Sequence, residues 1–137
     1  MTTPLWCLVA FVGWMFLILL AIGVEHFALV GRGRAEPADL GADVPHGGAR
    51  HGRLHRAHLN CVETLPAFAT LVLVATVAGI RGGGLDVLAV LVIVARIGQS
   101  LAHVASGGNL AVRIRLGFFL AQWACLVGFG VAILRGV

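Results

Sequence analysis

The chain has 137 residues, of which 59% are hydrophobic, and its mean hydropathy of +0.97 is far above that of a soluble domain. All ten basic residues are arginines, and the net charge is +4. Most arginines stand at the ends of apolar runs and not on a clustered polar surface, which argues against a nucleic-acid partner. We therefore predict a single-domain integral membrane protein over residues 1–137.

The first apolar run, Pro4 to Val30, is long enough for the ~20 residues that cross a ~30 Å hydrocarbon core. It lacks the basic start and the small-residue cleavage site of a signal peptide, so we expect a permanent span. Glu25 and His26 come near its far end. We expect them at headgroup depth, within reach of water; the alternative is that they point into the protein.

A change of composition to Gly, Pro, Asp, Arg and His predicts a loop over residues 31–54. Loops of about twenty residues in compact proteins are usually functional or disordered. His46, His51 and His55 raise the question of a metal site. Because neighbouring glycines leave their geometry undefined, we expect a solvated loop and no metal there.

A helix predicted over residues 54–80 carries polar side chains on one face. Arg56, Asn60 and Glu63 are spaced i, i+4, i+7, which places them together within about two turns. Ionisable groups at membrane depth tend to face a bundle interior or a wet cavity and to be functional. We therefore expect this face to form one wall of a ligand site, with a kink one turn further on at Pro66.

The third and fourth apolar runs repeat this pattern. Arg96, Gln99 and His103 are spaced i, i+3, i+7, and Arg115 shares a face with Gln122 seven residues later. Together the apolar runs predict four spans, at about residues 4–30, 58–80, 85–105 and 112–134.

The arginines also predict an orientation. With the N-terminus outside, seven arginines fall on the cytoplasmic side and two outside: Arg32, Arg34, Arg50, Arg53, Arg56, Arg113 and Arg115 against Arg81 and Arg135. By the positive-inside rule the loop at residues 31–54 is cytoplasmic. We expect a protein of the bacterial inner-membrane type whose site opens to the cytoplasm.

The polar residues of this inner half suit a small acidic zwitterion. Guanidinium groups bind carboxylates by paired hydrogen bonds, Glu63 can hold an ammonium group or orient an arginine, and Asn60 with two glutamines fits peptide amides. A metal site is a poor fit here, because the arginines would repel a divalent cation.

A family resemblance enters at these residues. The segment Arg56-Ala57-His58-Leu59-Asn60-Cys61-Val62-Glu63, with Pro66 and Phe68, resembles the R-A-H-x-N-x-x-E-x-x-P-x-F segment of the MAPEG family, the membrane-associated proteins of eicosanoid and glutathione metabolism. Ala95-Arg96 with His103, and the run from Arg113 to Gln122, resemble its third and fourth helices. The resemblance covers the chain from Leu54 onward, with a weaker echo at Glu36-Pro37-Ala38-Asp39. It implies an all-α, integral membrane four-helix bundle that assembles as a homotrimer and binds glutathione between subunits at the cytosolic side.

The resemblance also implies site residues. The glutathione contacts carry over to Arg56, His58, Asn60, Glu63, Arg96, Gln99, His103 and Gln122. The arginine beside the glutathione thiol corresponds to Arg115 or Arg113; helical phase leaves both open, and the face shared with Gln122 favours Arg115. His103 stands where some members have a tyrosine, and Phe118 fills another tyrosine position. Activation of the thiol would therefore depend on arginine or histidine.

The implied function is a microsomal-type glutathione transferase or peroxidase that acts on lipophilic electrophiles, with a thiolate stabilised by arginine. Glutathione would be the co-substrate, and a lipophilic small molecule or lipid the second partner. One alternative is a non-catalytic scaffold of the same fold that binds lipid or glutathione. Another is a haem-binding or transport bundle that uses His26, His58 and His103, although these form no stacked pair on facing spans.

Overall fold

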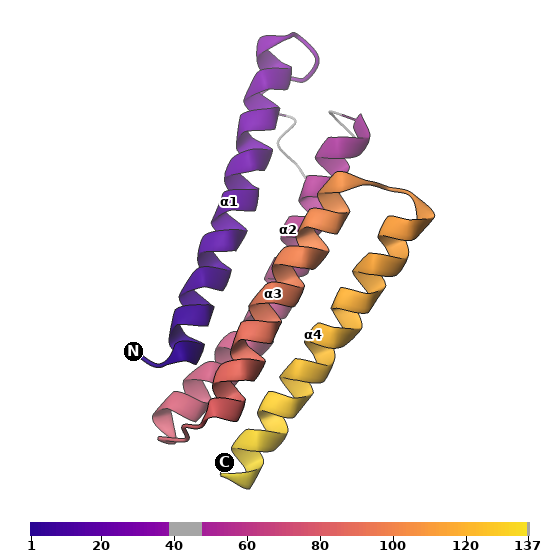
Figure 1. The fold of residues 1–137 in the computed structure, drawn as a ribbon. Helices are drawn as coiled ribbons and strands as arrows, with labels where there is room; N and C mark the ends of the chain where they lie inside the picture. The colour runs from indigo at the N-terminus through magenta and orange to yellow at the C-terminus, as the bar shows by residue number, and fades with distance from the viewer. Residues whose placement is uncertain (39–47, 137) are drawn as a thin grey trace.

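The computed structural model describes residues 1–38 and 48–136, and this part of the chain is built from four helices. They are α1 (Thr3–Gly31), α2 (Gly48–Val77), α3 (Gly83–Ala105) and α4 (Asn109–Arg135). The helices alternate in direction, so both termini and the α2–α3 turn lie at one end of the bundle (Figure 1). The end of α1, the start of α2 and the α3–α4 connection lie at the other end, which we call the arginine-rich end after Arg32, Arg34, Arg50, Arg53, Arg113 and Arg115.

Each helix is long and apolar enough to cross a membrane, which confirms the predicted all-helical membrane architecture. Large apolar side chains are exposed on every helix, for example Phe16, Leu73, Val94 and Leu120. Such a surface would be a liability in water but matches a hydrocarbon solvent, in which every backbone polar group must be paired within its own helix.

Three phenylalanines join α1, α2 and α4 in the core. The ring of Phe68 lies 5.8 Å from that of Phe11 and 6.5 Å from that of Phe129, edge to face in the second case. All three side chains are fully buried. Within the described residues α1 packs on α2 and α3 and not on α4. Phe68 therefore connects the first helix to the last.

The second helix begins earlier than the sequence predicted. We expected loop up to residue 54, yet α2 starts at Gly48, because the first helical turns find partners on neighbouring helices. Leu54 and His51 are buried, and the Nε–H of Arg53 donates to the Val104 carbonyl at the end of α3 (3.3 Å). Residues 39–47, which include His46 and the Asp39 of the family echo, lie outside the described part of the chain.

The same helix also ends earlier, at Val77 instead of about residue 80. Gly79 adopts a positive φ of 68°, and the N–H of Ile80 bonds back to the Ala75 carbonyl (2.9 Å). This glycine-dependent cap closes a helix by pairing its last carbonyls. Before that point α2 runs without a break through Pro66.

Helices α3 and α4 approach closely at Gly98. A Cβ atom placed there would lie 2.5 Å from the ring tip of Phe118, so the phenylalanine ring fills the space that a side chain on α3 would need. Phe118 thus has a packing role at this contact.

We predict that Gly98→Ala destabilises the protein by about 1–3 kcal/mol, because the added methyl group overpacks this contact. The measurement is thermal unfolding in detergent micelles. Gly117→Ala is the matched control, since nothing lies within 4 Å of a Cβ at that position, and it should leave the melting temperature unchanged or slightly raised. Equal melting temperatures for the two variants would show that the Gly98 contact is not tight.

Candidate functional site

A buried arginine stands at the centre of the polar residues. Arg96, on α3, is only 1% exposed. Its Nη1 donates to Oε1 of Gln99 (2.7 Å), and its Nη2 donates to the hydroxyl of Thr64 on α2 and to Oε1 of Gln122 on α4. On the remaining side its guanidinium carbon lies 5.8 Å from the centre of the Phe11 ring on α1. Side chains from all four helices therefore surround one positive charge.

The hydrogen-bond acceptors of this charge are neutral oxygens. A buried guanidinium is costly unless its N–H groups are bonded, and two of its three nitrogens are bonded here, while Nε has no partner among the described residues. The orientation of the Gln122 amide is fixed by a further hydrogen bond, because its Nε2 donates to the Val92 carbonyl (3.3 Å). We call Arg96, Thr64, Gln99 and Gln122 the buried arginine network.

A second chain of contacts lies nearer the arginine-rich end and again joins three helices. The amide of Asn60 on α2 lies 3.1 Å from Nε2 of His103 on α3. Nη1 of Arg115 on α4 lies 2.7 Å from Nδ1 of the same ring. All three side chains are partly buried. We call Asn60, His103 and Arg115 the outer relay.

The outer relay fixes the protonation pattern of its histidine. A guanidinium can only donate, so Nδ1 of His103 must accept from Arg115. The ring is then neutral with its proton on Nε2. The structure places Nδ2 of Asn60 next to that nitrogen, so the hydrogen bond forms with the amide oxygen and nitrogen of Asn60 exchanged; amide orientation is assigned from such networks. Both ring nitrogens of His103 are thus engaged.

The remaining predicted site residues lie at the surface of the single chain. Arg56, Glu63 and Arg113 are exposed, and His58 is half-buried, with an Nδ1 that has no partner among the described residues. Neither Arg56 nor Glu63 forms an ion pair with another described residue. Helical phase could not distinguish Arg113 from Arg115. In the structure Arg115 belongs to the outer relay, whereas Arg113 does not.

The structure places two of the predicted site residues in the interior of the bundle. Gln99 and Gln122 are 4% and 1% exposed and bond to Arg96, so they hold the interior together, and their contact with a cofactor stays a prediction. Sequence reasoning missed Thr64, whose hydroxyl also donates to the Asn60 carbonyl (2.9 Å). Its position four residues after Asn60, on the same helical face, was the available signal.

A separate cavity of about 340 Å³ lies at the opposite end of the bundle. It is lined by the start of α1 and the α2–α3 turn, including Thr2, Arg81 and Asp86. None of the predicted site residues lines it. We give it no role in the site, because the residues that line it lie at the end of the bundle that holds both termini (Figure 1).

A scan against family models matches residues 4–135 to the MAPEG family. A search of curated proteins finds no match. The family match extends from the first helix to the end of the fourth, beyond the segment from Leu54 on which the sequence resemblance was based.

The buried arginine network predicts strong coupling between its members. Gln122→Leu should cost about 1–3 kcal/mol, because it leaves part of a buried guanidinium unpaired. The double variant Arg96→Met, Gln122→Leu removes both partners, so we expect it to cost less than the sum of the single variants by about 1 kcal/mol or more. Unfolding free energies from denaturant titration in mixed micelles measure this cycle, and strictly additive costs would contradict the network.

Proposed function

The chain belongs to the MAPEG family, and from that premise we propose that it is a glutathione-dependent transferase or peroxidase acting on lipophilic electrophiles at the membrane. Membership itself indicates a membrane function related to glutathione or eicosanoid metabolism. The observation that carries the finer proposal is the outer relay, which holds Arg115 partly buried beside residues of α2 and α3.

The exposed charges next to the relay suit the polar groups of glutathione. Arg56 can bind a carboxylate through two parallel N–H groups, Glu63 can accept from the ammonium group, and Asn60 can pair with a peptide amide. Exposed charges at membrane depth are costly when they face lipid. We therefore propose that glutathione and a neighbouring copy of the chain cover Arg56 and Glu63 in a homotrimer.

The proposed chemical role of Arg115 is to stabilise the thiolate. A thiol with an ordinary pKa of about 8.5 is mostly protonated at neutral pH, and a nearby guanidinium favours the thiolate, which is the nucleophile. One N–H of Arg115 is held by His103 (2.7 Å), so the side chain is oriented while its other donors stay available. The thiolate then attacks an electrophilic carbon or peroxide oxygen that arrives from the lipid, and the leaving group departs with the bonding electrons.

The proposed orientation places this chemistry at the cytosolic face. The relay lies toward the arginine-rich end of the bundle (Figure 1), and positively charged ends usually stay on the cytoplasmic side. Soluble glutathione would then enter from the cytosol, and the lipophilic substrate from between the helices.

One observation favours the non-catalytic scaffold as the second candidate. Both ring nitrogens of His103 are engaged, by Asn60 and by Arg115, so this histidine is not free to take the proton of a thiol. Activation of the thiol would then depend on arginine alone. The same engagement argues against His103 as an axial haem ligand, because such a ligand needs a free ring nitrogen.

We predict that Arg115→Ala slows conjugation of glutathione to a model aryl halide by about tenfold or more, since each unit of thiol pKa changes the thiolate fraction about tenfold at neutral pH. The pH profile of the residual rate should move toward that of free glutathione. Steady-state kinetics in detergent micelles measure both effects.

Arg113→Ala is the matched control, because it removes an exposed arginine from the same helix. It should keep the pH profile of the unsubstituted protein and most of its rate. If Arg115→Ala retains both, the role of Arg115 is wrong. If the unsubstituted protein binds glutathione but conjugates nothing, the scaffold is the better description.

A further inference from the structure

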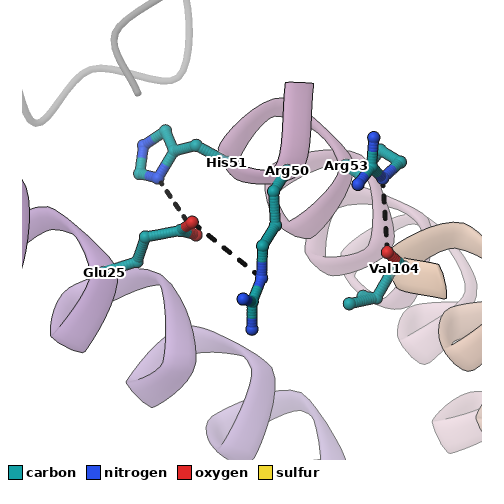
Figure 2. A network of polar contacts seen from close by, with 5 residues as sticks. All are labelled: Glu25, Arg50, His51, Arg53 and Val104. Atoms are coloured by element: carbon teal, nitrogen blue, oxygen red, sulfur yellow. Dashed lines mark hydrogen bonds and ion pairs between the residues drawn. The ribbon is translucent and has the colours of Figure 1, made fainter. Parts of the chain in front are cut away.

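A second polar cluster lies where α1 meets the start of α2. The carboxylate of Glu25 on α1 lies 3.7 Å from Nδ1 of His51 and 4.0 Å from Nε of Arg50, both on α2. Figure 2 shows these two side chains directed at the carboxylate from the same helix, while Arg53 turns away to Val104. None of these residues belongs to the buried arginine network or to the outer relay.

The same cluster contains two histidines whose rings lie close together. His51 and His55 are four residues apart on α2, and their Nε2 atoms lie 3.0 Å from each other. His51 is 5% exposed, and His55 is half-buried. Their glycine-rich surroundings predicted a solvated loop with no defined geometry. The early start of α2 at Gly48 instead places both histidines on one helical face.

From this pair we infer a transition-metal site: His51 and His55 chelate a divalent ion of the zinc, nickel and copper class through their Nε2 atoms, with Glu25 orienting His51. Two imidazoles bound to one ion at ~2.05 Å have nitrogens about 2.9 Å apart at a right angle and about 3.3 Å apart in a tetrahedron. The observed 3.0 Å falls within that range. Imidazole is a preferred ligand for this class of ion.

The carboxylate beside His51 supplies a second, independent indication. Histidines that bind metals through one nitrogen usually donate the other N–H to a carboxylate, which fixes the tautomer and the ring orientation. Nδ1 of His51 and Oε2 of Glu25 are both buried, and each lacks a hydrogen-bond partner among the described residues. They face each other at 3.7 Å, so a small movement completes the bond when a metal fixes the opposite nitrogen.

The surrounding groups set the coordination and the affinity. The described residues contain no group of three or more His, Cys, Asp or Glu side chains that could hold an ion, so the remaining positions would go to water or to an anion. The neighbouring His26 is buried, with an unpartnered Nε2. Arg50 is exposed and lies beside Glu25, and its charge should weaken cation binding.

The test is zinc titration of tag-free protein in detergent micelles by isothermal calorimetry, without glutathione. We expect one zinc ion per chain. His55→Gln should weaken binding at least tenfold, and Glu25→Gln about tenfold or more, as is typical when an outer-shell carboxylate is lost. Zinc should also raise the melting temperature of the unsubstituted protein and not that of His55→Gln, because a ligand stabilises only the fold that binds it.

Two further variants make the assignment specific. Arg50→Gln should tighten zinc binding, since it removes a repulsive charge. His58→Gln, on the next turn of the same face, should bind zinc within about threefold of the unsubstituted protein, because it alters no ligand. The proposal is overturned if the unsubstituted protein binds no zinc, or if His58→Gln weakens binding as much as His55→Gln.

Discussion

The buried guanidinium of Arg96 is the constraint on which the rest of the bundle depends. In a lipid environment a charge of this kind must find acceptors inside the protein, and each nearby helix supplies one: Thr64 from α2, Gln99 from α3 and Gln122 from α4. Because hydrogen bonds are directional, these contacts fix the rotation of each helix about its own axis. Packing between apolar side chains alone could not fix these rotations.

The outer relay depends on that arrangement. Asn60 and Thr64 are one helical turn apart and are joined by the hydroxyl-to-carbonyl bond of Thr64, so fixing Thr64 on Arg96 also fixes Asn60 opposite His103. Arg115 then completes the relay from α4. We propose that the buried arginine network holds the outer relay, whose residues come from three helices, in the shape that a preorganised binding site requires.

The sequence predicted the architecture better than the role of each polar residue. Hydropathy and helical spacing were enough for four spans and for the polar stripes on α2 and α3, because both follow from the cost of polar groups in lipid. The spacing could not distinguish an interior residue from a ligand-facing one: Gln122 and Arg115 share a helical face, yet one bonds to Arg96 and the other to His103. The start of α2 was also misjudged, because glycines and histidines at residues 48–55 predict loop until the contact of His51 with Glu25 is known.

The central claim is that the outer relay and the charges beside it bind glutathione, and direct binding tests it most simply. Calorimetric titration of the purified protein with glutathione should give a saturable heat, and Asn60→Leu should abolish it, because that change removes both a ligand group and the hydrogen-bond partner of His103. No heat with the folded, unsubstituted protein, or unchanged affinity in Asn60→Leu, would contradict the account.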